Sequence, residues 1–286
     1  MPFLPISRRK FLRLSAAAGI VALGADSTLL EPNRPRVVRQ EITLRRWPAP
    51  LNGFTIGLLS DFHYDAYFSV HPLRAAIGMV RDLHPDLIAL TGDFVSVPWI
   101  GEPTSQVHYA EPCALLLKEL QAPHGVWAVL GNHDVASDPD RVTDALTSHG
   151  IPVLANQAVP IERNGARFWL AGVDDILGGA PDLHTALLKI PTDEAVVLMA
   201  HEPDFADYVC RYSVDLQLSG HSHGGQVKLP FLRPLYLPEL AKKYIRGSYK
   251  IKELALYTNP GIGTVGIPVR FNCPPEVTLL TIRSAA

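Results

Sequence analysis

Five short apolar runs of this chain each end in side chains that bind metal ions or transfer protons. The ends read Asp61-Phe62-His63, Gly92-Asp93, Gly131-Asn132-His133-Asp134, His201 and Gly220-His221-Ser222-His223. Carboxylates and imidazoles, with one amide oxygen, form a ligand set that suits divalent ions such as Mn, Fe or Zn. A single aspartate or histidine at a strand end is ordinarily a turn or capping residue. Their recurrence after five successive runs predicts a shared metal site.

The spacing within these ends indicates how the side chains converge. Residues two apart in an extended segment point to the same side, so we expect Asp61 beside His63 and His221 beside His223. Glycine precedes three of the ends, at Gly92, Gly131 and Gly220. A glycine at such a position allows a sharp turn and a close approach of the backbone to the site.

The apolar runs alternate with segments of helical periodicity. Buried strands are predicted at 54–59, 87–90, 126–130, 195–200 and 215–219, and helices at 73–83, 114–120, 138–149 and 205–212. A hairpin pattern covers 159–171, and later strands are predicted at 226–229, 254–258 and 277–282. This order predicts an α/β fold, a four-layer α-β-β-α sandwich of two mixed sheets flanked by helices. The metal site is expected at the carboxyl ends of the strands, where α/β sheets bind ligands.

The N-terminal residues carry the pattern of an export signal. The basic segment Ser7-Arg8-Arg9-Lys10-Phe11-Leu12-Arg13 precedes an apolar stretch over 14–25, which is shorter than a membrane span. The arginine pair resembles the twin-arginine signal, which exports folded proteins across the bacterial inner membrane. Residues 1–25 are therefore expected to be a signal peptide, cleaved near 22–24 or kept as an anchor. An ordinary amphipathic helix is the alternative.

Composition excludes several classes of protein. Hydrophobic residues make up 47% of the 286 residues and charged residues 19%, which excludes an intrinsically disordered chain. The formal net charge of −2 offers no basic field for nucleic acid. The cysteines Cys113, Cys210 and Cys273 are too few for a disulfide scaffold, and the sequence leaves their pairing open.

Taken in order, the five ends resemble the motif series of the calcineurin-like metallophosphoesterase family: Asp-x-His, Gly-Asp, Gly-Asn-His-Asp/Glu, His and Gly-His-x-His. The runs 223–227, 259–263 and 270–276 look like the exported bacterial branch of that family, which carries a twin-arginine signal. Residues 26–50 are expected to be a linker with a possible edge strand at 37–44, because 31–50 are rich in proline and arginine. On the resemblance, 51–286 are the metallophosphoesterase domain.

The resemblance also implies a role for each polar residue. It assigns Asp61, His63, Asp93 and His223 to one ion, and Asp93, Asn132, His201 and His221 to a second. Asp93 would bridge two divalent ions (Mn, Fe or Zn). His133 would contact no metal and would stabilise or protonate the leaving group, with Asp134 orienting it. Outer carboxylates commonly hold ligand imidazoles, and the candidates are Asp65, Asp174, Asp175 and Glu202.

The implied activity is hydrolysis of a phosphodiester by a metal-activated hydroxide. The segment 230–249 mixes leucine, phenylalanine and tyrosine with lysine and arginine, which suits a phospholipid or lipid-linked substrate at a membrane surface. Simple cover of a sheet edge explains this composition equally well. The expected location is the periplasm, the cell envelope or the inner membrane, reached through the twin-arginine machinery.

Three other functions stay open at this point. A UDP-diacylglucosamine-type pyrophosphohydrolase has the same chemistry, but its substrate is cytoplasmic, which conflicts with an export signal. A non-catalytic protein of the cell envelope would bind metal without turnover. A nuclease would use the same metals, although the acidic net charge argues against it.

Overall fold

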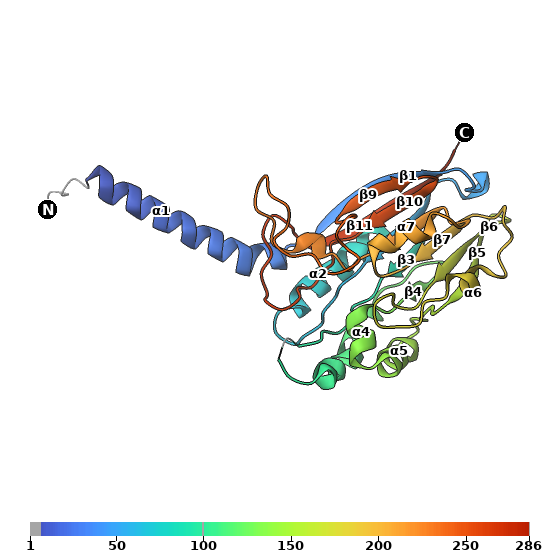
Figure 1. Cartoon of the computed structure of the whole chain (residues 1–286), viewed down its shortest axis with the longest axis horizontal. Helices are drawn as coiled ribbons and strands as arrows, with labels where there is room; N and C mark the ends of the chain where they lie inside the picture. Colours follow the sequence, from blue (N-terminus) through green and yellow to red (C-terminus); the bar gives the residue numbers. More distant parts are fainter. Residues whose placement is uncertain (1–6, 99, 286) are drawn as a thin grey trace.

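The computed structural model describes residues 7–98 and 100–285, and its strands form two sheets (Figure 1). The first sheet has the order β1-β11-β2-β3-β4, with β1 (Arg36–Leu44), β2 (Phe54–Leu59), β3 (Leu87–Leu90), β4 (Val126–Ala128) and β11 (Glu276–Ser284). The second has the order β5-β6-β7-β8-β10-β9, with β5 (Gln157–Arg163), β6 (Ala166–Gly172), β7 (Val196–Met199), β8 (Leu216–Ser219), β9 (Gly247–Ile251) and β10 (Leu254–Thr258). Both sheets are mixed, because β11 runs antiparallel to β2 and β5 antiparallel to β6.

The two sheets pack face to face around one buried apolar cluster. Phe54 and Ile56 of β2 and Phe168 of β6 belong to it, and the rings of Phe54 and Phe168 lie 5.2 Å apart. Helices α2 (Val70–Leu83), α3 (Ala110–Leu117) and α5 (Pro139–Ser148) cover the other face of the first sheet, and α6 (Leu183–Leu187) and α7 (Ala206–Val209) that of the second. Strands buried on both faces need this cover, so the predicted α-β-β-α sandwich is confirmed.

Some predicted elements differ in the structure. The expected strand at 226–229 is not formed, because the chain turns at η6 (His223–Gly225) and only Val227 makes a single bridge, to Phe271. Gly224 and Gly225 have positive φ, and this backbone cannot continue a ladder. The shorter helical segments are α4 (Asn132–Ser137), η3 (Ala49–Leu51), η4 (Pro103–Tyr109) and η5 (Pro203–Phe205). Of these, α4 contains Asn132, His133 and Asp134 of the predicted site, and the sequence periodicity had not indicated a helix there.

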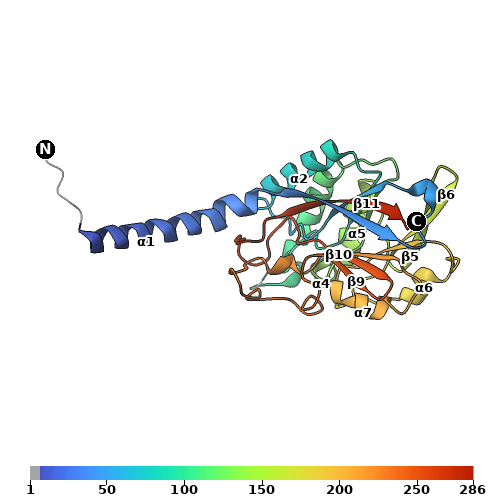
Figure 2. The same cartoon turned by 90° about the horizontal axis from the view of Figure 1, so that it is seen from above.

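The N-terminal segment is one continuous helical rod that leaves the body (Figures 1 and 2). Helix α1 (Arg8–Ala25) continues through η1 (Asp26–Leu30) and η2 (Glu31–Asn33), and none of the side chains in α1 is buried. The rod Arg8–Asn33 has the length and composition to cross a membrane, unlike the shorter apolar stretch counted in the sequence. The difference arises because the helix extends beyond the apolar residues at both ends.

The base of this rod is attached to the C-terminal part of the chain. The Arg270 backbone N–H donates to the Ser27 carbonyl at 2.9 Å, and the Glu31 carboxylate accepts the N–H groups of Asn272 and Cys273. Residues 26–33 are thus packed structure rather than an open linker. They connect α1 directly to β1, which lies at the edge of the first sheet.

Candidate metal centre

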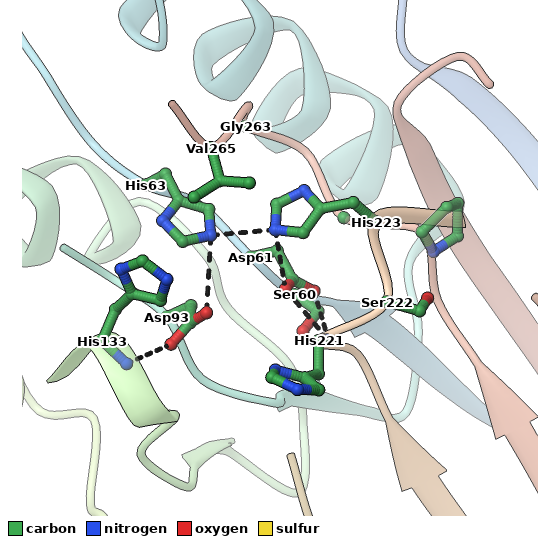
Figure 3. A network of polar contacts seen from close by, with 12 residues as sticks. Ser60, Asp61, His63, Asp93, His133, His221, Ser222, His223, Gly263 and Val265 are labelled. Atoms are coloured by element: carbon green, nitrogen blue, oxygen red, sulfur yellow. Dashed lines mark hydrogen bonds and ion pairs between the residues drawn. The ribbon is translucent and has the colours of Figure 1, made fainter. Parts of the chain in front are cut away.

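The polar strand ends come together at one edge of the sandwich. Strands β2 and β3 of the first sheet and β7 and β8 of the second run parallel within their sheets, and each leads into one of the predicted ends. The carboxylates and imidazoles gathered there are all buried: Asp61, His63, Asp93, His201, His221 and His223. Figure 3 shows most of them pointing toward one another. The topology therefore converts five separated motifs into one cluster.

Four of these side chains form a first possible ion site. The ligand atoms of Asp61, His63, Asp93 and His223 all lie within 4.8 Å of one another. His63 Nε2 is 3.0 Å from His223 Nε2 and 3.4 Å from Asp93 Oδ2, and His223 Nε2 is 3.3 Å from Asp61 Oδ1. Two carboxylates and two imidazoles converging in this way match the donor preference of divalent transition metals.

A second group shares Asp93 with the first. The ligand atoms of Asp93, His201 and His221 lie within 4.8 Å of one another, and His201 Nε2 is 3.2 Å from Asp93 Oδ2. In the described part of the chain, Asn132 Oδ1 and His201 Nε2 are buried without a hydrogen-bond partner. Buried polar atoms are rarely left unpaired unless an ion or water completes them. The donor set therefore fits a metal ion at each group.

We expected an extended backbone at these ligands, but the structure shows a different conformation. Asp61, His63, Asp93, His221 and His223 all have positive φ, between 41° and 65°. The chain turns at each of these residues, and Asp61 and His63 meet in the first group as expected. The expectation that His221 lies beside His223 is wrong, because the turn directs His221 into the second group and His223 into the first. A non-glycine residue in this region costs on the order of 1–3 kcal/mol and is characteristic of functional sites.

Close approach of the backbone explains all three predicted glycines: at Gly92, where φ is +94°, a Cβ would overlap the Gly131 backbone. A Cβ at Gly220 would overlap Ser60 Oγ and Asp61 Oδ2, and one at Gly131 would overlap Asp93 Oδ1. Any larger residue at Gly131 or Gly220 would displace a predicted ligand.

The ligand imidazoles are held by a hydroxyl and by backbone carbonyls. His63 Nδ1 donates to Ser96 Oγ at 3.0 Å, His201 Nδ1 to the Thr91 carbonyl, and His221 Nε2 to the Glu239 carbonyl at 2.8 Å. These bonds leave Nε2 of His63 and His201 and Nδ1 of His221 as the ligand atoms. The sequence contained no local signal for these partners, because they lie up to 110 residues away.

None of the four carboxylates expected to hold the imidazoles does so. Asp65 accepts the N–H groups of Tyr67 and Phe68, and Asp174 accepts those of Asp175 and Ala180. Asp175 accepts the N–H groups of Leu177 and Gly178, and Glu202 accepts that of Ile176. Their side chains therefore shape loops around the site rather than orient its ligands.

Burial keeps most of the ligand imidazoles neutral. It lowers the pKa of His63 and that of His221 to about 3, and lowers the pKa of His223 well below its usual value. Burial also opposes charge on His201, but the nearby Asp93 carboxylate raises the pKa of that imidazole above its usual value. A neutral imidazole has the lone pair that a metal ion requires, and an ion at the second group would displace the His201 proton.

His133 is placed beside the cluster without joining it. Its ring lies edge-on to His63, with centroids 4.7 Å apart, and its Nδ1 accepts the Val97 N–H at 2.8 Å. In a neutral imidazole that accepts at Nδ1, the proton is on Nε2. His133 also lines the cavity described below, so its Nε2–H is available as a donor to a ligand there.

Asp134 has a different partner from the one expected. Its carboxylate accepts four backbone N–H groups, from Gly131 at 3.0 Å, Asp93 at 2.8 Å, Phe94 at 2.8 Å and Val95 at 3.1 Å. The contact that orients His133 comes from the Val97 N–H instead. Asp134 therefore holds the loop that carries Asp93.

A buried arginine supports the opposite side of the cluster. The Arg270 guanidinium donates to three backbone carbonyls, including those of Gly263 and Cys273. The Gly263 N–H donates to the Asp61 carbonyl at 2.7 Å, and the Cys273 thiol donates to the His223 carbonyl at 3.1 Å. The loop 260–273 thus connects two predicted ligands, Asp61 and His223. The sequence did not indicate this connection.

A cavity of about 840 Å³ opens from the metal-ligand cluster. One side consists of predicted site residues, including Asp93, Asn132 and His133. The other side is apolar and is formed by Val227, Leu235, Tyr236, Pro238, Val265, Ile267 and Val269. The sequence had indicated only the wall from 230–249. The wall from 265–269 was missed, although its apolar composition was a usable signal.

Comparison with known proteins agrees with this geometry. The family described as calcineurin-like phosphoesterase matches residues 54–225, which contain all the strand ends described above. The chain therefore belongs to the calcineurin-like phosphoesterase family and is a metal-dependent phosphoric ester hydrolase.

Three relatives show how far the similarity extends. The uncharacterised metallophosphoesterase YkuE of Bacillus subtilis is 34% identical over 98% of both chains. Phosphodiesterase YaeI of Escherichia coli is 31% identical over 97% of this chain and 99% of its own. A zebrafish (Danio rerio) transmembrane protein with a metallophosphoesterase domain is 32% identical over 88% of this chain and 58% of its own.

Proposed function

We propose that this protein is an exported phosphodiesterase with two divalent ions, of which one binds to Asp61, His63, Asp93 and His223. The second binds to Asp93, Asn132, His201 and His221. The observation that carries the proposal is that two buried donor groups share a single carboxylate, Asp93. A shared carboxylate offsets part of the repulsion between two dications and keeps them close enough to act on one phosphate.

The chain's own residues prepare the reaction in three ways. When bound, the ions (Mn, Fe or Zn) would supply Lewis acidity and lower the pKa of water toward neutrality. Asp93 holds both ion sites in place, and its loop is fixed by the Asp134 carboxylate. The Nε2–H of His133 faces the cavity and donates to the phosphate oxygen on which charge develops, or to the departing oxygen.

The substrate best suited to the cavity is an amphiphile, such as a phospholipid or a lipid-linked phosphodiester. One wall offers ion sites and a hydrogen-bond donor, and the second wall is formed mostly by aliphatic and aromatic side chains, with Gln226 among them. A soluble nucleotide would leave this second wall exposed to water. The proposal therefore includes contact with a membrane surface, and it gives a UDP-diacylglucosamine-type substrate as the alternative of similar chemistry.

Export through the twin-arginine machinery is part of the proposal. The basic residues Arg8, Arg9, Lys10 and Arg13 precede an exposed apolar helix, which is the arrangement of an export signal or an anchor. The word transmembrane in the name of the zebrafish relative supports a membrane location. The active domain would then lie in the periplasm or the cell envelope.

The experiment that tests the activity is hydrolysis of bis-p-nitrophenyl phosphate by the full chain in detergent, stripped of metal and refilled with Mn. Asp93→Asn is expected to abolish turnover and reduce bound metal, because it alters both ion sites. His133→Ala is expected to keep the metal and lose about 10²–10⁴-fold in turnover. His184→Ala, an exposed histidine on α6, is the matched control.

Two results would contradict the proposal. Full metal occupancy without turnover on this ester or on a phospholipid would favour a non-catalytic binding protein of the envelope. Wild-type turnover by His133→Ala would remove the role assigned to that imidazole.

A further inference from the structure

Large apolar side chains are exposed in three loops on one side of the molecule. Tyr67 and Phe68 are 83% and 59% exposed, Phe231 and Leu232 are 104% and 57% exposed, and Ile267 is 51% exposed. We call these five residues the apolar rim. Scattered apolar side chains are normal on a protein surface, whereas a gathered set indicates a binding surface.

The rim loops lie at the end of the body that carries the base of the N-terminal rod. Phe68 lines a small cleft together with Thr28, Asn33 and Pro268. The side chain of Gln226 donates to the carbonyls of Val265 and Ile267, and so joins the segment before Phe231 to the loop of Ile267. Both cartoon views show the loops around 230–240 and 262–272 at the end of the body from which α1 projects (Figures 1 and 2).

Two of the rim loops are built to direct their apolar side chains outward. The Asp65 carboxylate accepts the N–H groups of Tyr67 and Phe68 and so closes the turn that exposes both rings. Phe231, which follows Pro230, has φ of +65°, a backbone that a bulky residue rarely adopts. Neither arrangement buries the ring inside the protein, so folding alone does not explain it.

The rim continues into the cavity of the metal centre. Ile267 belongs to both, and the cavity-lining side chains of Leu235 and Tyr236 are 71% and 72% exposed. An acyl chain at the rim could therefore reach the apolar wall while its phosphate lies at the ion sites. The loop charge is also suitable, since Lys228 and Arg233 are exposed and no acidic residue occurs between 224 and 238.

The orientation of the N-terminal rod determines which side of the membrane faces the apolar rim. Helix α1 has 18 residues and is about 27 Å long, close to the roughly 30 Å hydrocarbon core of a bilayer, and the residues that follow it are attached to the body. Its basic residues, Arg8, Arg9, Lys10 and Arg13, are at the end remote from the body. Basic residues remain on the cytoplasmic side, so the body would lie on the outer side with its rim against the membrane.

We propose that the apolar rim docks on the outer surface of the bilayer that α1 crosses, so that the cavity opens directly onto the lipid. The docking is independent of the chemistry, while delivery of a lipid phosphate to the ion sites rests on the proposed function. The binding partner of the apolar rim is thus a lipid bilayer, and the retained N-terminal helix holds the protein against it.

The test uses the full chain reconstituted in phosphatidylcholine–phosphatidylglycerol vesicles. A polarity-sensitive NBD dye is attached at Phe231→Cys or Phe68→Cys in a Cys210→Ala background, since the other two cysteines are buried. The matched control is Leu188→Cys, which is 65% exposed beside α6 at the far end of the body (Figure 1). Retention of α1 in the bilayer is verified in every sample by resistance to carbonate extraction.

Both rim labels are expected to shift to the blue and to be quenched by nitroxide-labelled lipid, while the Leu188 label does neither. Rim labels that behave like the Leu188 label in vesicles with α1 inserted would overturn the docking. A blue shift already present in detergent and lost on dilution would assign the rim to a second copy of the chain, and would also overturn it.

A second readout separates docking from chemistry. Phe231→Asp is outside the cavity lining, so it is expected to hydrolyse bis-p-nitrophenyl phosphate at the wild-type rate but vesicle phospholipid at least tenfold more slowly. Leu188→Asp is expected to leave both rates unchanged. Inserted labels without phospholipid cleavage would support docking and overturn the lipid substrate. Absence of turnover on both esters would overturn the proposed function instead.

Discussion

The four hydrogen bonds to Asp134 lead to a prediction with a defined size. Asp134→Asn keeps the shape of the side chain but replaces one acceptor oxygen by an NH₂ group. Each carboxylate oxygen accepts two backbone N–H groups, so two buried donors would lose their acceptor. A buried unpaired donor costs about 1–3 kcal/mol, and we therefore expect the free energy of unfolding to fall by about 4 kcal/mol.

The assay is thermal and urea unfolding of the metal-stripped protein, followed by titration with Mn. At roughly 2–4 °C per kcal/mol, the midpoint should fall by about 8–16 °C. Metal affinity should fall by about 10–100-fold, because the loop of Asp93 loses its support. Asp138→Asn is the control: this residue caps α5 through one N–H, and asparagine caps a helix equally well.

The same variant separates two accounts of Asp134. If this carboxylate acted by orienting His133, as the motif resemblance implies, the variant would lose turnover with unchanged unfolding and metal affinity. That result would refute the assignment of Asp134 to the Asp93 loop.

Three further predictions follow from packing and burial. Removing metal should lower the unfolding midpoint, and Mn at about 100 times its Kd should restore about 2.7 kcal/mol; an unchanged midpoint would argue against buried ion sites. Gly220→Ala should lower the free energy of unfolding by about 2–3 kcal/mol and release metal, because its Cβ overlaps Asp61. Gly78→Ala in α2, where a Cβ meets nothing within 4 Å, should raise it by about 0.5–1 kcal/mol. Urea unfolding measures both. Cys210 alone should react with Ellman's reagent in the native protein, because Cys113 and Cys273 are free but buried; two or three fast thiols would contradict this burial.

The fold was predictable to the level of its layers, because strand and helix periodicity are local properties. Runs such as 54–59 and 87–90 are apolar without alternation, which is characteristic of strands covered on both faces. The region after His223 was not predictable in the same way. Its composition suggested a strand, but two glycines at positive φ and a bridge to Phe271, far along the chain, decide its path.

The sequence by itself determined which side chains gather at the site. Each predicted ligand stands directly after a buried strand, and parallel strands in one sandwich must deliver such residues to the same edge. The order and spacing of the five motifs were sufficient for that inference. They were also sufficient for the family, which the family match over 54–225 supports independently.

Only the tertiary structure decided how those side chains are held and what they face. The hydrogen bonds that the imidazoles donate to Ser96 Oγ, the Thr91 carbonyl and the Glu239 carbonyl join residues 18 to 110 positions apart. The second wall of the cavity and the attachment of the N-terminal rod to Cys273 likewise depend on contacts between distant segments. Such contacts leave no periodic or local trace in a sequence, because they are selected by the packing of the whole chain.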